Sequence, residues 1–375
     1  MAEEKIEKGT ERAPLSEISK MNEMNTDFDD VTFEKQVPFD FSEDVPEAAA
    51  QVVAEETKKK KTRKVDISKL SIIEERDPIT KQRELKNALF GNKSAFLIIA
   101  AQSGYAAQMA PLVHKDALTI LYSNLSRYEY KKNLYKVIYE KIVSFSVGKM
   151  TFDEWLRNTS VEDLETFYYG IYCATFPDEG TLTLTCPDCG KSEVYRVSNL
   201  NLTKTTDRKA MKKLIEEVSK NAINMDAMRQ YSLIGKNDAF MLDNSGFIVE
   251  LKTPSLWDSL ELLRLVPEAV IDRSPTNVTN MLYINRILVP KKPGGTMKDS
   301  SYVEHNDRQE LLRIVDNLSI DDAQEIQDAV DERVEAHKIS YSIKNYKCSN
   351  CGKEIKEIPI SIEEILFTLI YDKIQ

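Results

Sequence analysis

The sequence has few of the residues and motifs on which catalysis most often depends. Its 375 residues include only three histidines, His114, His305 and His337, and each stands in charged or helical surroundings without a companion motif. The P-loop, the GxGxxG dinucleotide fingerprint, the HExxH helix and the GxSxG turn are all missing. These absences predict a protein that is not an enzyme. The alternative, an enzyme with an unrecognised site between the two cysteine motifs, would require a clustered pocket of titratable groups.

Long hydrophobic runs are also missing. The most apolar stretch, residues 95–101, has seven residues before Gln102-Ser103-Gly104 interrupts it, whereas a membrane-spanning helix needs about twenty. The N-terminus is charged and lacks the apolar stretch of a signal peptide. We therefore expect no membrane span and interpret residues 95–101 as a core helix.

The chain has fewer basic residues than acidic ones, with 51 lysines and arginines against 61 aspartates and glutamates. The net charge is -10 and the pI is near 5.2, so the surface as a whole repels phosphate backbones and makes nucleic acid an unlikely partner. Local basic groups are the exception: the run Lys58–Lys64, together with Lys209, Lys212 and Lys213, could form a basic face. A solvated linker is the simpler interpretation of the run.

The five cysteines carry the clearest chemical signal. Two Cys-x-x-Cys-Gly motifs, a first knuckle at Cys186–Gly190 and a second knuckle at Cys348–Gly352, use four of them. Each knuckle offers two thiolates, and its glycine permits the positive φ that lets backbone N–H groups point at sulfur. Four sulfurs fill the coordination shell of Zn²⁺ and leave no position for substrate. The sequence therefore predicts one structural zinc bound by Cys186, Cys189, Cys348 and Cys351.

The flanking residues favour this prediction over two unrelated pairs or a dithiol redox centre. Alternating residues surround each knuckle, at 181–185 and 191–197 for the first and at 339–343 and 354–360 for the second, which predicts two hairpins with the knuckles at their tips. A redox CxxC would open a helix beside a βαβ unit. The fifth cysteine, Cys173, lies in an apolar helical pattern and is expected to be a buried packing residue.

The spacing of the knuckles gives the metal a stabilising role. Closing a loop of about 160 residues costs on the order of 4 to 5 kcal/mol. A Cys₄ zinc site contributes roughly 10 to 16 kcal/mol in small peptides. The metal can therefore offset the closure and still stabilise the fold.

The chain divides into segments of different composition. We predict an α+β fold, mainly helical, with a split Cys₄ zinc-ribbon-like element and a disordered N-terminal tail. The predicted segments are a disordered or partner-ordered tail at 1–65, a helical domain at 66–180, the first zinc hairpin at 181–200, an inserted α/β segment at 201–338, and the second zinc hairpin with a C-terminal helix at 339–375.

Individual elements can also be placed. Helical spacing is seen from Leu118 to Ile142, and hydroxyl residues with an acid three positions on, at Thr151 and Ser160, predict two capped helices, the second ending near Phe176. Further predictions are a basic helix at 209–218, a strand at 247–251, a loop at 290–295, helices at 256–265, 307–318 and 320–336, and a final helix that begins after Ser361. The apolar face of that final helix requires a partner.

The order of these features resembles one known family. The chain has a helical region ending in Phe167–Tyr172, then the first knuckle, then an insertion carrying Val249–Ser255, and finally Leu318–Asp322 and a closing stretch from Tyr346 to Ser361 that holds the second knuckle. Over about residues 85 to 375 this looks like the zinc-knuckle baseplate-hub assembly proteins of contractile-tailed phages. The resemblance implies a structural or assembly factor of the tail's hub that acts by protein contacts, with only the four cysteines carried over as site residues.

The expected partners are other phage tail or baseplate proteins. They would bind through the N-terminal tail, whose phenylalanines suit docking as a short linear segment, and through the C-terminal helix. A flexible tail with incidental aromatic residues is the alternative. The expected location is the virion tail baseplate, or the host cytoplasm during assembly. The alternative function is a zinc-ribbon nucleic-acid-binding or transcription-associated protein.

Overall fold

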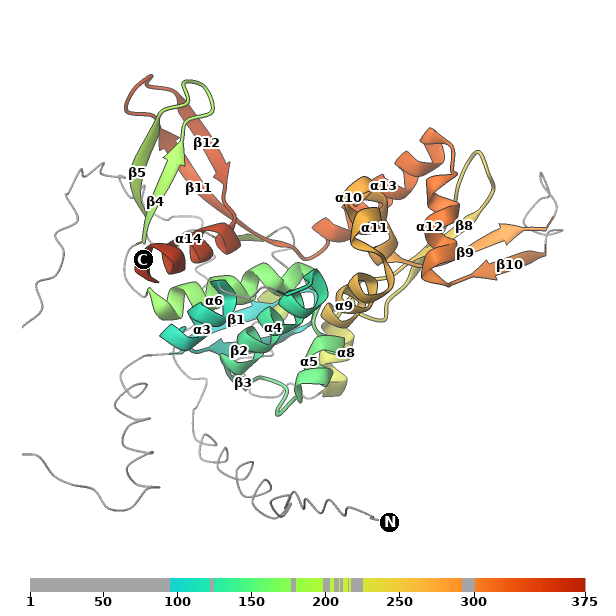
Figure 1. The fold of residues 1–375 in the computed structure, drawn as a ribbon, viewed down its shortest axis with the longest axis horizontal. Coiled ribbons are helices and arrows are strands. Elements are labelled where there is room, and N and C mark those ends of the chain that lie inside the picture. The colour runs from blue at the N-terminus through green and yellow to red at the C-terminus, as the bar shows by residue number, and fades with distance from the viewer. Residues whose placement is uncertain are drawn as a thin grey trace, which may run out of the picture. The chain divides into compact units, whose positions relative to one another are not determined.

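The fold is mixed α+β. The computed structural model (Figure 1) describes residues 95–121, 125–176, 180–197, 203–205, 209, 212–214, 216, 225–291 and 301–374. In this part of the chain, helices alternate with four small antiparallel sheets, so strands are a larger component than a mainly helical fold implies. The predicted tail at 1–65 and its basic run lie outside the described residues.

The first sheet corrects one sequence prediction. Residues 95–101, predicted as a core helix, contain strand β1 (Phe96–Ala100), which pairs with β2 (Tyr105–Met109) and through it with β3 (Ile142–Phe145). A short apolar run fits a buried strand as well as a buried helix, and here the turn at Gly104, with φ of +78°, folds the chain back on itself. The predicted helical pattern from Leu118 to Ile142 is also not one helix. It falls in two helices, at His114–Leu121 and Arg127–Glu140, and its last residue, Ile142, begins β3.

Two helices pack on this sheet: α6 (Leu164–Thr175) contacts β1 and β2, and α4 (Arg127–Glu140) contacts β3. The other helices of this core pack around α4 and α6; they are α3 (His114–Leu121), α5 (Phe152–Asn158), the short 3₁₀ helix η3 (Val161–Asp163), α9 (Leu256–Leu265) and α14 (Ile362–Ile374). The predicted capping box at Thr151 and Glu154 is confirmed. Every residue of α6 from Thr166 to Ala174 is buried, including Cys173, as expected for a packing residue. The helix can be apolar all round because β1 and β2 lie on one side of it and α14 on another.

Gly170 lets α6 approach the sheet. A Cβ at this position would lie 2.5 Å from Cγ2 of Ile98 and 2.6 Å from Cγ of Met109. We expect Gly170→Ala to lower the free energy of unfolding by about 1 to 3 kcal/mol, although alanine favours helices. Urea unfolding measures the change.

A double variant tests the cause of that loss. Ile98→Ala with Met109→Ala removes both of the atoms that the new Cβ would meet. If the clash is responsible, Gly170→Ala should cost less in this double variant than in wild type. An equal cost in the two backgrounds, or a Gly170→Ala protein more stable than wild type, would contradict the close approach.

The region between the knuckles forms a second core. Its sheet has the order β10-β9-β8-β7, built from β7 (Asp238–Met241), β8 (Ile248–Leu251), β9 (Ile284–Pro290) and β10 (Tyr302–His305). The helices of this region are α8 (Met225–Tyr231), α10 (Glu268–Arg273), α11 (Pro275–Tyr283), α12 (Arg308–Asp316) and α13 (Ile320–Glu335). The predicted strand at 247–251 and helices at 256–265, 307–318 and 320–336 are confirmed. Of the predicted loop at 290–295, Pro290 ends β9 and only Lys291 is otherwise described.

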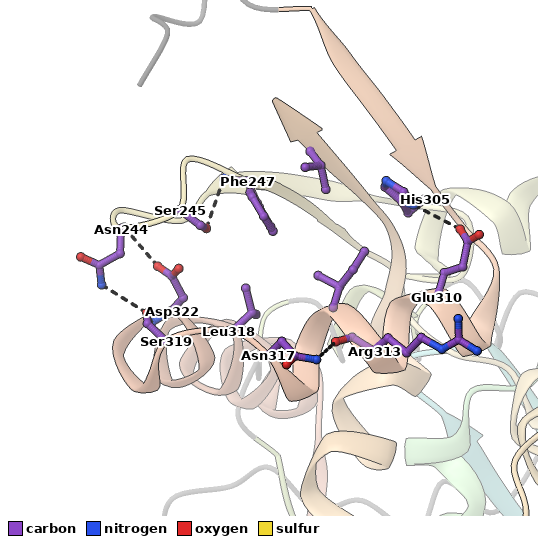
Figure 2. Close-up of a pocket in the computed structure, with 12 residues that line it drawn as sticks. Asn244, Ser245, Phe247, His305, Glu310, Arg313, Asn317, Leu318, Ser319 and Asp322 are labelled. Atoms are coloured by element: carbon purple, nitrogen blue, oxygen red, sulfur yellow. Dashed lines mark hydrogen bonds and ion pairs between the residues drawn. The ribbon is translucent and has the colours of Figure 1, made fainter. Parts of the chain in front are cut away.

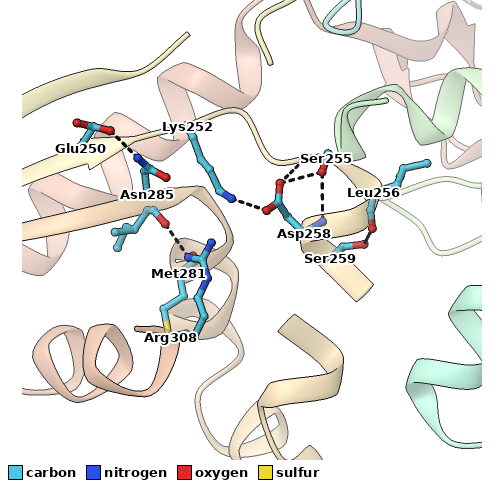
Figure 3. A network of polar contacts seen from close by, with 10 residues as sticks. Glu250, Lys252, Ser255, Leu256, Asp258, Ser259, Met281, Asn285 and Arg308 are labelled. Atoms are coloured by element: carbon cyan, nitrogen blue, oxygen red, sulfur yellow. Dashed lines mark hydrogen bonds and ion pairs between the residues drawn. The ribbon is translucent and has the colours of Figure 1, made fainter. Parts of the chain in front are cut away.

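A polar network joins the second sheet to helix α9 (Figure 3). Lys252, just after β8, forms an ion pair with Asp258, whose carboxylate also accepts hydrogen bonds from the backbone and hydroxyl of the N-cap residue Ser255. Arg308 of α12 donates to the carbonyl oxygens of Met281 and Ile284 at 2.8 and 2.7 Å. Burial lowers the pKa of Lys252, whereas Lys252 lowers the pKa of Asp258 despite its burial. The pair holds the strand and the helix at a fixed junction.

Asp163 connects the first sheet to the helices. Ser160 caps η3 through the N–H of Glu162, so the predicted capping box with Asp163 does not form. The Asp163 carboxylate instead accepts hydrogen bonds from the backbone N–H groups of Gln102 and Ser103, at 3.2 and 2.7 Å, and from the Ser103 hydroxyl at 2.6 Å. The Gln102 side chain continues the connection by donating to the carbonyl oxygen of Ala336, at the end of α13, at 2.8 Å.

The buried carboxyl of Asp163 predicts a pH effect on stability. Burial raises its pKa to about 6, although hydrogen bonds from Ser103 and Gln102 oppose the rise. Between about pH 4 and 6 the folded state therefore holds a proton that the unfolded chain releases. The contribution of Asp163 to stability is complete below about pH 4 and is lost as the pH rises through 6.

Comparison with Asp163→Asn isolates this contribution, because other titrating groups are common to both proteins. We expect the stability difference, wild type minus variant, to fall by about 1 to 3 kcal/mol from pH 4 to pH 7. Chemical unfolding across that range measures it. A difference that stays constant with pH, or grows, would show that Asp163 does not titrate in this way.

Candidate metal centre

The two knuckles lie at the tips of two hairpins, as predicted. Strands β4 (Gly180–Thr185) and β5 (Ser192–Val197) form the first hairpin, and β11 (Ile339–Lys347) and β12 (Glu354–Pro359) form the second. Strand β6 (Thr203–Thr205) pairs with the other edge of β11. Both hairpins and their tips can be followed in Figure 1.

The knuckles repeat one backbone geometry. In the first, the N–H of Cys186 donates to the carbonyl of Lys191 and the N–H of Gly190 donates to the carbonyl of Cys186, at 2.9 and 2.8 Å. In the second, Cys348 and Gly352 make the equivalent bonds, both at 3.0 Å. The glycines have φ of 68° and 69°, and a Cβ on either would meet no atom within 4 Å. The backbone conformation, rather than lack of space, therefore explains the preference for glycine at these positions.

The four predicted ligands come together. The sulfur atoms of Cys186, Cys189, Cys348 and Cys351 all lie within 4.8 Å of one another. The two pairs across the hairpins are closer, with 3.8 Å between Cys186 and Cys351 and 3.7 Å between Cys189 and Cys348. Sulfurs placed tetrahedrally at about 2.3 Å from a zinc ion would be about 3.8 Å apart. The donor set and its spacing fit a tetrahedral metal ion.

The electrostatics of the cluster also favour a cation. Backbone N–H groups of Cys351 and Asn350 direct their dipoles at the Cys348 sulfur and lower its pKa to about 6. At Cys351 the N–H of Lys353 acts in the same direction, but partial desolvation of the sulfur and the neighbouring sulfurs raise the pKa to about 12. Four thiolates cannot coexist at this spacing without a compensating positive charge, which a bound metal ion would supply.

Side chains around the knuckles join the hairpins independently of the sulfurs. Glu193 of β5 accepts a hydrogen bond from the Tyr346 hydroxyl of β11 at 2.5 Å and another from the Ser349 hydroxyl. An ion pair links Lys353 to Asp188 at 3.1 Å, and the Asn350 amide donates to the Cys189 sulfur at 3.6 Å. Hydrogen bonds from Ser349 and Tyr346 lower the pKa of Glu193, which keeps it an acceptor. These contacts were not predictable from the sequence, because Glu193 has the same pattern as any outward-facing residue of an alternating strand.

The centre is anchored to the first core through β11. The Tyr341 ring lies 4.9 Å from the Tyr169 ring of α6, centroid to centroid, and the Tyr341 hydroxyl donates to Thr166 at 3.1 Å. Cys186 and Cys348 are buried, whereas Cys189 and Cys351 are exposed. One cysteine of each knuckle is therefore shielded from solvent, and the other is accessible to it.

The other predicted features have different surroundings. His305 lies 3.1 Å from Glu310, His337 has a positive φ of 56°, and His114 begins α3. In the described part of the chain, the four cysteines are the only group of three or more His, Cys, Asp or Glu residues positioned for one metal ion. Of the predicted basic helix at 209–218, the described residues Lys209, Lys212 and Lys213 are exposed.

The apolar face of the final helix is covered within the chain. Ile362, Leu366 and Ile370 of α14 are buried, and Phe367 meets Tyr168 of α6 edge-on at 5.8 Å between ring centroids. The predicted cap is present, because the N–H of Glu364 donates to the Ser361 hydroxyl at 3.2 Å. What remains open on α14 is its outer side, where Tyr371 is exposed.

In comparisons with known proteins, no protein-family model, no curated protein and no solved structure matches this chain. Among the described residues, no helix combines the length and the apolar character needed to cross a membrane. The family resemblance drawn from the sequence therefore stays a prediction.

Proposed function

We propose that this protein is a non-enzymatic component or assembly factor of the baseplate hub of a contractile-tailed phage, stabilised by one structural zinc ion. The observation that carries the proposal is the four-sulfur centre, in which two hairpins far apart in sequence meet at one tetrahedral site. Four cysteine ligands leave no coordination position for substrate, which supports a role in holding the fold.

Zinc is the metal that best fits the ligands. A tetrahedral set of four thiolates is typical of structural zinc, and zinc brings no redox chemistry to the site. Elemental analysis of the purified full chain should find about one zinc per chain. Iron in place of zinc, or no metal, would overturn this assignment.

The proposed partners are other tail or baseplate proteins. The order of elements around the knuckles, which resembles the zinc-knuckle hub family, supports them. They would bind through the N-terminal segment and through the outer side of α14, since the inner side of that helix packs against α6.

Phage assembly tests this function. A phage carrying a stop codon in the gene should accumulate tail-less heads or tails without a complete hub, visible by electron microscopy, and supplying the protein in trans should restore infectivity. Co-expression with hub and tape-measure proteins should give a complex. Normal particles from the mutant phage would overturn the proposal.

The exposed cations Lys209, Lys212 and Lys213 favour one second candidate, a nucleic-acid-binding protein. Salt distinguishes the two functions. Phosphate-dominated binding should fall by about a thousandfold or more between roughly 50 and 200 mM salt, whereas a protein complex held by apolar contacts should persist. Substituting the three lysines with glutamine should weaken binding to nucleic acid and leave the protein complex unchanged.

A further inference from the structure

A pocket lies on the second core, and none of the four cysteines lines it (Figure 2). Its volume is about 680 Å³, and it lies between the turn that joins β7 to β8, strands β9 and β10, helix α12 and the start of α13. Its apolar lining residues are Phe247, Val289, Ile314 and Leu318. This size is in the range that holds a ligand or several side chains of a bound segment.

Eight of the twelve residues that line the pocket are polar or charged, and two exposed apolar residues lie beside it. Ile320, the first residue of α13, is 88% exposed and directly follows the pocket residue Ser319, and Val303 of β10 is 40% exposed. A β-branched side chain so exposed at a helix start contributes nothing to the protein's own core. Together with the apolar lining residues, Ile320 and Val303 offer contacts for the apolar side chains of a bound segment.

Helix α13 extends from this pocket with unusual negative charge. Its 16 residues include seven acids and one arginine. Arg333 is engaged elsewhere, with Asp238, the carbonyl of Lys236 and Thr253. No ion pair joins any cation of the described residues to five of the acids: Asp321, Glu325, Asp328, Asp331 and Glu332.

The helix dipole stabilises the negative charge of only some of these acids. Asp321 lies in the first turn, where negative charge is stabilising, but Asp331 and Glu332 lie near the C-terminus, where it is not. Several of the acids are three or four residues apart, so like charges face one another along the exposed side. A row of positive charges alongside the helix would relieve this repulsion.

The chain carries such a row. We propose that the segment from Lys58 to Ile67 of the same chain docks on this surface, with the basic run along α13 and Val65 and Ile67 in the pocket. Six of the seven residues from Lys58 to Lys64 are cationic. Extended, seven residues span about 23 Å, close to the length of about 24 Å of the 16-residue helix. The same segment thus offers charge for the helix and apolar side chains for the pocket.

The connection is long enough. Gln102 contacts the carbonyl of Ala336, and from there α13 leads back over about 25 Å to Ser319 at the pocket. The residues from Ala95 to Gln102 add at most about 25 Å, so Ala95 lies within roughly 50 Å of the pocket. The 28 residues from Ile67 to Ala95 can span up to about 90 Å.

Tethering makes even weak docking effective. A segment tethered to the surface that it binds experiences a local concentration on the order of 1 mM when its connection can span the distance. An intrinsic Kd of about 0.1 mM would then leave the surface occupied about nine-tenths of the time. Docked residues would be protected from proteolysis about tenfold.

Limited digestion of the full chain with trypsin tests the proposal, because trypsin cleaves after lysine and arginine. The rate of cleavage within residues 58–64, followed by mass spectrometry, should rise about tenfold when α13 carries Asp328→Lys and Asp331→Lys. Both side chains are exposed, so the fold should be retained. Val65→Ser with Ile67→Ser should raise the rate in the same way.

A matched variant controls for net charge. Glu140→Lys with Glu216→Lys reverses two exposed acids elsewhere and should leave the cleavage rate at its wild-type value. Equal rates in wild type, the α13 variant and this control would overturn the proposal. Protection that disappears on dilution would also overturn it, since a second copy would then supply the segment. The assay requires no hub protein, so its result is independent of the proposed function.

Discussion

Substituting Cys351 with serine should abolish stable metal binding and loosen both zinc hairpins. The serine hydroxyl is a poor replacement for a thiolate, so three ligands would remain to hold the ion. Because the sulfurs join segments about 160 residues apart, their loss removes both the metal's binding energy and the loop closure. We expect the free energy of unfolding to fall by about 5 kcal/mol or more, a large part of the stability of an ordinary domain.

The measurements are metal content by mass spectrometry and hydrogen exchange across the hairpins. In the Cys351→Ser protein, amides of β4, β5, β11 and β12 should exchange faster, while those of β1 and β2 should change less. A chelator should produce the same pattern in wild type, and added zinc should reverse it.

Cys173→Ala is the matched control, because this cysteine is buried in α6 and its thiol pKa is raised to about 12 by burial. That variant should keep one metal ion per chain while losing some packing stability. A Cys351→Ser protein that retains a full equivalent of metal would refute the four-sulfur site.

Substituting Asp163 with alanine should cause the second large effect. The carboxylate is the acceptor for two backbone N–H groups and one hydroxyl, all in a buried turn. Removing it leaves these donors without an acceptor, and each buried unsatisfied donor costs about 1 to 3 kcal/mol. We expect a loss of about 3 to 5 kcal/mol, measured by chemical unfolding.

The exposed residue Asp153 provides a control for the effect of Asp163→Ala. Asp153 lies exposed in the first turn of α5, where its interaction with the helix dipole is worth about 0.5 kcal/mol, so Asp153→Ala should have a correspondingly small effect. If the two alanine variants proved equally stable, the buried network around Gln102 and Ser103 would not be supporting the fold.

Local chemistry was predictable from the sequence. The alternating residues beside each knuckle predicted the two hairpins, and the cysteine spacing predicted the four sulfur ligands, because a knuckle is defined by five consecutive residues. The cap at Thr151 likewise depends on a few adjacent residues, and its helix begins as expected.

Predictions that depended on distant neighbours were less successful. The run from residue 95 to 101 was interpreted as a helix and contains strand β1, because its periodicity does not distinguish the two and its pairing partner β2 decides between them. Asp163 was assigned to a helix cap and instead serves a turn 60 residues earlier in the chain. The apolar face of α14 was left for another protein and is covered by α6.

The sequence alone determined the ligand chemistry: thiolates in number and spacing suited to one closed metal site, on turns that only glycine completes without strain. Only the tertiary structure decided which segments meet, namely that Glu193 reaches the second knuckle, that α6 lies between β1 and α14, and that a pocket opens at the start of α13. The physical reason is range. The pair of thiolates in each knuckle and the helix caps depend on residues a few positions apart, whereas packing depends on surfaces that a linear sequence does not place side by side.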